Sequence, residues 1–176
     1  MIKRIVICMG VMSSVLLGLA DTEIKASPGA FLVIWNGRDM STSALATVVD
    51  RGNQFSIKNA MQDPAVSKIR SVTCRWSGIL NITDPGVYIF NVVHNARHSK
   101  SSVSVKINGI SVVNGSGGGS SSKNVTLPGA VAIEITMSVD NFNRSFSKDS
   151  VLIRYKKEGD IDYVTISPKV LYHVVK

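Results

Sequence analysis

The chain has 176 residues and a formal net charge of +8, because 20 Lys and Arg residues outnumber 12 Asp and Glu residues. Its length suits one domain with a single hydrophobic core. The cations are scattered along the sequence, which favours a solvated basic surface and argues against a nucleic-acid-binding face. Abundant Val, Ile and Ser with few aromatic residues favour strands over helices.

The N-terminal residues predict export. Lys3 and Arg4 precede an apolar stretch from Ile5 to Leu19, and Gly18-Leu19-Ala20 supplies small residues at the cleavage spacing of a secretory signal peptide. The apolar stretch is shorter than the roughly 20 residues of a membrane span, so contact with a membrane is expected only during export. We therefore expect a secreted, periplasmic or cell-surface protein. The expected organisation is a signal peptide at residues 1–20, a short leader at residues 21–27 and a single domain at residues 28–176.

One cysteine, Cys74, remains after removal of the signal peptide. A lone cysteine in an exported protein either pairs between chains or stays free. Cys74 shares one face of a predicted strand with Val72 and Trp76, which favours a buried, inert thiol. No disulfide within the chain is expected.

The elements predicted before residue 72 are short. Phe31–Trp35 is predicted to be a strand, and Gln54–Met61 is predicted to contain another that ends at Asp63-Pro64. Ser41–Val49 fits neither the helical nor the strand period, so both remain open.

Residues 72–113 predict an antiparallel β-meander. Successive side chains of a strand point to opposite faces, so Tyr88, Phe90 and Val92 are expected to share one face. Residues that fix or permit turn conformations separate the strands. The turns are Asp84-Pro85-Gly86 and Asn108-Gly109.

The remaining residues continue this pattern. Gly115–Ser122 has no side chains able to pack, which predicts a mobile loop. Ala130–Val139 alternates apolar and polar residues, which indicates a half-buried strand, and shorter strands are predicted at Val151–Lys156 and Tyr163–Ile166. Strands at short intervals with antiparallel turns predict an all-β fold, an antiparallel β-sandwich or barrel.

Several segments carry motifs in a defined order. They are Gly29–Val33, Val72-Thr73-Cys74-Arg75-Trp76-Ser77-Gly78, Asp84–Phe90, Val103–Val113, Val151–Tyr155 and Ile166–Tyr172. In this order they resemble the PA14 domain, a β-sandwich or barrel module of a bacterial toxin component, of yeast flocculins and adhesins and of some glycosidases. The resemblance covers nearly the whole expected domain and implies a PA14-like β fold.

The resemblance also implies ligand binding by loops at one end of the barrel, often to carbohydrate. In calcium-dependent members, two adjacent aspartates after the "Y-x-F" strand hold a Ca²⁺ ion that contacts sugar hydroxyls. Here the segment His94–Lys100 lacks those aspartates, whereas Ca²⁺ takes about six to eight oxygen ligands. We therefore carry over no metal and expect no cofactor.

The same segment is the first candidate ligand-binding site. Its candidate residues are His94, Asn95, Arg97 and His98, which with Lys100 offer hydrogen-bond donors to a carboxylate, a sulfate or a glycan. The alternative is a solvated turn with surface histidines. A transition-metal site at His94 and His98 would lack a third ligand.

The second candidate site is the polar loop that follows Val139. Asp140, Asn141 and Asn143 offer acceptors and donors to sugar hydroxyls, and Phe142 could stack on the apolar face of a sugar ring. The alternative is an Asx-rich turn, which the same residues favour.

The sequence contains no G-x-S-x-G, no H-E-x-x-H and no phosphate-binding glycine loop, so we expect no enzymatic activity. The expected function is a non-catalytic binding module, a carbohydrate-recognising adhesin-like protein with a glycan as its partner. The alternative is a protein–protein subunit of a pilus, secretion, conjugation or toxin-associated surface assembly, with a surface protein as its partner.

Overall fold

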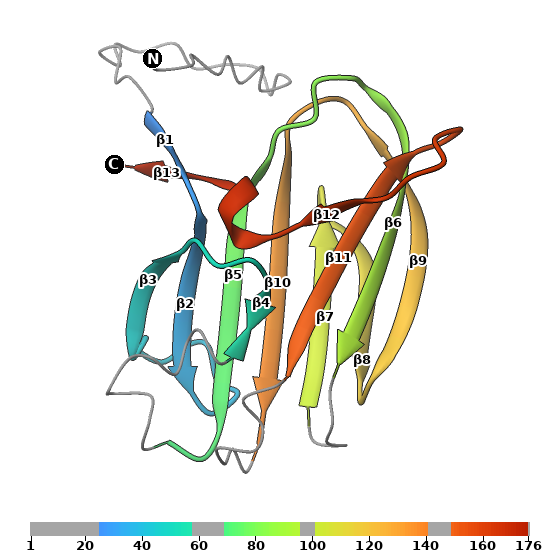
Figure 1. The fold of residues 1–176 in the computed structure, drawn as a ribbon. Coiled ribbons are helices and arrows are strands. Elements are labelled where there is room, and N and C mark those ends of the chain that lie inside the picture. Colours follow the sequence, from blue (N-terminus) through green and yellow to red (C-terminus); the bar gives the residue numbers. More distant parts are fainter. Residues whose placement is uncertain (1–24, 58–68, 96–100, 141–148, 176) are drawn as a thin grey trace, which may run out of the picture.

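The computed structural model describes residues 25–57, 69–95, 101–140 and 149–175. In these residues two sheets of antiparallel strands pack face to face as a β-sandwich (Figure 1). Sheet A contains β1 (Lys25–Pro28), β2 (Ala30–Asn36), β3 (Ala46–Asp50), β5 (Val72–Leu80), β7 (Ser101–Ile107), β8 (Ile110–Ser116), β10 (Val131–Val139) and β13 (Tyr172–Val175). Sheet B contains β4 (Phe55–Ser56), β6 (Gly86–Asn95), β9 (Gly119–Leu127), β11 (Ser150–Lys157) and β12 (Val164–Ile166). The predicted all-β antiparallel fold is confirmed.

The core lies between the two sheets, and strands such as β6, β7 and β10 contribute alternate residues to it. In β10 every second side chain from Val131 to Val139 is buried, as the alternation predicts. β5 contributes Cys74 and Trp76, both fully buried, and the Phe55 ring meets the Trp76 ring edge-on at 6.1 Å. Burial raises the pKa of the Cys74 thiol to about 12, and the prediction that this thiol is buried is confirmed.

The predicted meander is wrong in its pairing. β5 pairs with β2 and β10 in sheet A, whereas β6 pairs with β9 and β11 in sheet B. Asp84-Pro85-Gly86 therefore leads the chain from one sheet to the other and does not close a hairpin. Only β7 and β8 form the expected hairpin, with Asn108 and Gly109 at φ values of 51° and 76°. Alternation identifies the buried face of each strand but not the strand that lies beside it.

The structure of the Gly/Ser tract, Gly115–Ser122, also differs from the prediction. Gly115 and Ser116 end β8, a turn follows at Gly117 (φ 77°), and β9 begins at Gly119. β8 pairs with β7 and β9 with β6, so backbone hydrogen bonds hold these residues although their side chains do not pack. In place of the predicted loop, two strand ends and a tight turn connect the edge strands of the two sheets.

The two ends of the described chain pair with each other at one edge of sheet A. β1 pairs with β13 and starts at Lys25, inside the expected leader, while the expected signal peptide lies outside the described residues. A 3-10 turn at Pro168–Val170 precedes β13 and brings Leu171 against β5. A Cβ atom on Gly78 would lie 2.9 Å from the Leu171 Cβ, so the glycine of the W-S-G motif makes room for this segment.

The short elements agree with the sequence in part. β2 confirms the strand predicted at Phe31–Trp35, and β3 shows that the second half of the ambiguous segment Ser41–Val49 is a strand. β4 confirms a strand inside Gln54–Met61, of which residues 58–61 lie outside the described part. In the described ranges, no helix has the length and apolarity to cross a bilayer.

Candidate functional site

Both candidate segments leave the sandwich at the same end. Val139 at the end of β10 lies opposite Val72 and Ser101, the first residues of β5 and β7. Asn95 at the end of β6 lies opposite Ser150, the first residue of β11. We call this end, at the bottom of Figure 1, the loop end. The register thus brings together the ends of two segments that are far apart in the sequence.

Three of the eight candidate residues belong to the described part of the chain. Asn95 is exposed at the end of β6. The Asp140 carboxylate accepts a hydrogen bond from Arg38 Nε at 2.9 Å and forms an ion pair with Arg38 Nη2 at 2.8 Å. This ion pair ties the end of β10 to the β2–β3 connection, which is a structural role. The other candidates, Arg97, His98, Asn141, Phe142 and Asn143, lie outside the described residues.

His94 differs from the surface histidine of the alternative interpretation. Its side chain is 5% exposed and follows Tyr88, Phe90 and Val92 on the inward face of β6. Burial lowers the pKa of the imidazole, and the Asp149 carboxylate and the Gly117 backbone oppose this effect only in part. The buried Nε2 atom has no hydrogen-bond partner among the described residues. His94 is therefore a neutral, incompletely paired imidazole at neutral pH.

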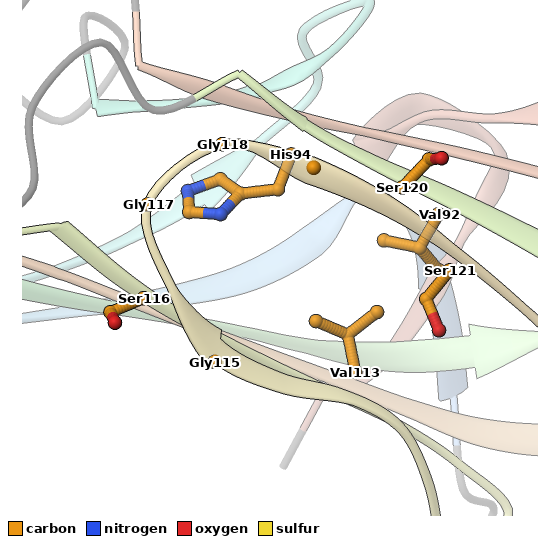
Figure 2. A pocket seen from close by; sticks show the side chains of 10 residues that line it. Val92, His94, Val113, Gly115, Ser116, Gly117, Gly118, Ser120 and Ser121 are labelled. Carbon is orange, nitrogen blue, oxygen red and sulfur yellow. The ribbon is translucent and has the colours of Figure 1, made fainter.

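A cavity of about 130 Å³ opens beside this imidazole. Figure 2 shows the His94 ring beneath the turn that Gly117 and Gly118 form between β8 and β9. The lining consists of Val92, His94, Val113 and the tract from Gly115 to Ser121. Because the glycines carry no side chains, the turn leaves space that larger residues would fill. The sequence analysis missed this side of the cavity, since it treated the Gly115–Ser122 tract as a loop.

A buried carboxylate connects the neighbouring segments. Ser101 Oγ donates to Asp149 Oδ2 at 2.7 Å, and the Asp149 carbonyl accepts from the Ile57 backbone N–H at 3.3 Å and from Ser56 Oγ at 3.4 Å. Ser56, Ser101 and Asp149 are all buried. Asp149 therefore anchors the ends of three chain segments at the loop end. Sequence analysis missed it because Asp149 lies between the polar loop after Val139 and the strand predicted at Val151–Lys156, where no element or role was assigned.

The Asp149 carboxylate interacts with both neighbouring polar side chains of this site. Ser101 Oγ donates to it, and its charge opposes the effect of burial on the pKa of His94. The described residues hold no group of three or more His, Cys, Asp or Glu side chains placed for a metal ion. His94, at the position where the resemblance implies calcium ligands, is a neutral imidazole and does not fit a cation that prefers oxygen.

The chain is similar to several solved structures. An anti-sigma factor domain-containing protein matches with a TM-score of 0.60 and 16% identity over 87% of this chain, which spans 51% of that chain, about half its length. The PA14 domain of the antifreeze protein MpAFP matches with a TM-score of 0.59 and 13% identity over 89% of this chain and 96% of its own. A PA14 sugar-binding domain from an RTX adhesin matches with a TM-score of 0.50 and 17% identity over 79% and 94%.

No family model and no curated protein matches the sequence. At the identities above, the likeness to solved structures concerns the fold alone. It agrees with the order of motifs along the sequence, from the strand before Asn36 to the turn before β13. The chain has a PA14-like fold.

Proposed function

We propose that the chain is an exported, non-catalytic binding module that recognises carbohydrate at its loop end. The observation that carries this proposal is the small cavity beside His94. It lies at the loop end, where the chain enters both candidate segments. Loops positioned by a rigid β-scaffold are common places for binding residues.

The chemistry of the cavity supports a sugar. Val92 and Val113 offer an apolar surface to the C–H groups of a sugar ring, and the neutral imidazole of His94 offers hydrogen bonding to a hydroxyl. The hydroxyls of Ser116 and Ser120 add donors and acceptors at the rim. The sugar-binding domain of the RTX adhesin has the same fold, which agrees with this proposal.

A glycan array tests the proposal, with Gly119→Leu as the blocking variant. A Cβ atom on Gly119 meets no atom within 4 Å, and Gly119 lies opposite the inward-facing His94, so a leucine side chain at this position is expected to extend into the cavity. Thr126→Leu is the matched control, on the exposed face at the far end of the same strand. We expect saturable binding by the wild type and the control, retained in chelator, and its loss in Gly119→Leu. A silent array, or equal binding by all three proteins, would contradict the proposal.

The second candidate function, a protein–protein subunit, is favoured by the turn between β11 and β12. Ile161 is 90% exposed there, and Val164 and Tyr163 are 55% and 40% exposed. Exposed apolar side chains that lie together commonly mark an interface. Chemical cross-linking in the native envelope, compared between the wild type and Ile161→Asp, tests this function. A defined complex that the variant loses supports the subunit, and an identical pattern for both contradicts it.

A further inference from the structure

The outer face of sheet B is a second surface with its own chemistry. It consists of the odd-numbered residues of β6 and the even-numbered residues of β9 and β11, whose neighbours in sequence point into the core. These positions contain no Asp or Glu, but they contain Arg154 and Lys156. The side chains on β9 are exposed and those on β11 are half-buried, so solvent reaches the face. In Figure 1 the strands of sheet B that carry this face, β11, β6 and β9, lie in the right half of the picture.

A row of polar side chains crosses this face from strand to strand. Arg154, Asn91 and Ser122 lie opposite one another in the register of β11, β6 and β9. Arg154 Nη2 donates to Asn91 Oδ1 at 3.0 Å, and Asn91 Nδ2 donates to Ser122 Oγ at 3.0 Å. These bonds fix the three side chains before any ligand arrives, which reduces the entropy lost on binding.

The two cations border an exposed aromatic ring. The Tyr163 ring is within 5.7 Å of the Arg154 guanidinium carbon and 5.1 Å of Lys156 Nζ. Lys156 Nζ also donates to the Asp160 carbonyl at 2.9 Å. No carboxylate of the described residues pairs with either cation. Arg154 Nε is buried and has no hydrogen-bond partner among the residues that the structure describes, so these residues do not fully satisfy the guanidinium.

We infer that the outer face of sheet B binds an acidic polysaccharide through its uronate carboxylates. The planar guanidinium of Arg154 matches a carboxylate, and Lys156 adds a second positive charge beside it. Asn91 and Ser122 hydrogen-bond neighbouring hydroxyls, and the exposed part of the Tyr163 ring packs on a sugar ring. Two cations on a flat face match the spaced charges of a uronate polymer better than the denser charges of a sulfated one.

Nearby carboxylates limit where the ligand lies. Glu158, Asp160 and Asp162 belong to the turn beyond the end of β11, so an anionic chain is repelled at that end of the face. The polysaccharide is therefore expected to follow the row from Arg154 toward β9. Removing charge from the turn, as in Asp162→Asn, should strengthen binding.

Isothermal titration with oligogalacturonate tests the inference, with neutral dextran and dextran sulfate as comparison ligands. Arg154→Gln removes the charge and keeps a side-chain amide that can contact Asn91. Lys106→Gln is the matched control, because Lys106 lies on the outer face of sheet A, 3.9 Å from Glu134. Thermal melting of each variant verifies that it folds.

We expect Arg154→Gln to weaken oligogalacturonate binding about tenfold or more and to reduce its salt dependence. Lys106→Gln should change the affinity less than twofold, and Asp162→Asn should increase it. Gly119→Leu should have no effect, because the cavity at the loop end is a separate site. Equal losses of affinity in Arg154→Gln and Lys106→Gln would show that only the overall positive charge matters, which would overturn the inference. Equal binding of neutral dextran, or tighter binding of dextran sulfate, would also overturn it.

Discussion

Trp76 donates its indole Nε1–H to the Asp50 carboxylate at 2.8 Å inside the core. The other carboxylate oxygen of Asp50 accepts the backbone N–H of Gly52 at 2.8 Å. Trp76 is fully buried and Asp50 is 7% exposed. The hydrogen bond joins the end of β3 to β5 across β2, so it connects the edge of sheet A to its centre.

Replacing Asp50 should destabilise the fold. Asp50→Ala leaves the Trp76 indole N–H buried without this acceptor, and the free energy of unfolding should fall by about 1.5 to 3 kcal/mol. Urea denaturation measures this change. The double variant with Trp76→Phe should lose less than the sum of the single variants, because the two residues share one interaction. Strictly additive losses would contradict the pairing.

Gly78 should not tolerate a side chain. In Gly78→Ala the new Cβ would lie 2.9 Å from the Leu171 Cβ and 3.3 Å from the Tyr172 carbonyl oxygen, so the segment before β13 must shift. Overpacking of this kind costs about 1 to 3 kcal/mol. Gly115→Ala in β8 is the control, since its Cβ meets no atom within 4 Å. Thermal unfolding should show a lower Tm for Gly78→Ala only, and an unchanged Tm would contradict the close contact.

The sequence predicts those features of the fold that depend on neighbouring residues. Alternation along β10 identifies its buried face, and Asn108-Gly109 identifies a hairpin turn, because both signals are local. The partners of β5, which are β2 and β10, have paired residues 36 or more positions away in the sequence, so the local pattern could not exclude a meander. The Gly115–Ser122 tract was mispredicted because its order comes from backbone pairing with β6 and β7 rather than from its own side chains.

The candidate site was predictable to a similar extent. The alternation of Tyr88, Phe90 and Val92 extends to His94, and this period indicates that the imidazole points inward. That signal was present in the sequence, but the histidine was weighed as a surface residue. Asp149 gave no such signal, because its bonds to Ser101 and to the Ile57 backbone join segments that only the tertiary fold brings together.

Cys74 should be unreactive in the folded protein. Its thiol is fully buried, and burial, with the nearby Asp50 carboxylate, raises its pKa to about 12. A chromogenic disulfide reagent at pH 8 should therefore modify Cys74 only at the rate at which the protein unfolds. In urea the same thiol should react at once, which is the control. Modification of the native protein at the rate of a free thiol would contradict this burial.

Acidification should weaken the fold through His94. Burial lowers the pKa of this imidazole from its usual value of 6.5, so below that pH the unfolded chain binds a proton that the folded chain does not. The contribution of His94 to the free energy of unfolding is fully present above about pH 6.5. It is lost as the pH falls toward the folded-state pKa, by at most about 1.4 kcal/mol per pH unit. Urea denaturation between pH 7.5 and 5 measures this slope and avoids the range in which carboxylates titrate.

His94→Gln isolates that contribution. The variant lacks the titrating group but retains an amide that can hydrogen-bond near Asp149, so its stability should depend less on pH than that of the wild type across this window. His173→Gln is the matched control, since His173 contacts the Gly29 carbonyl at the opposite end of the sandwich and is half-buried. The control should retain the His94 slope. If His94→Gln and the wild type lost stability in parallel, the imidazole would not be held neutral by burial, and its contribution to the cavity would have to be reassigned.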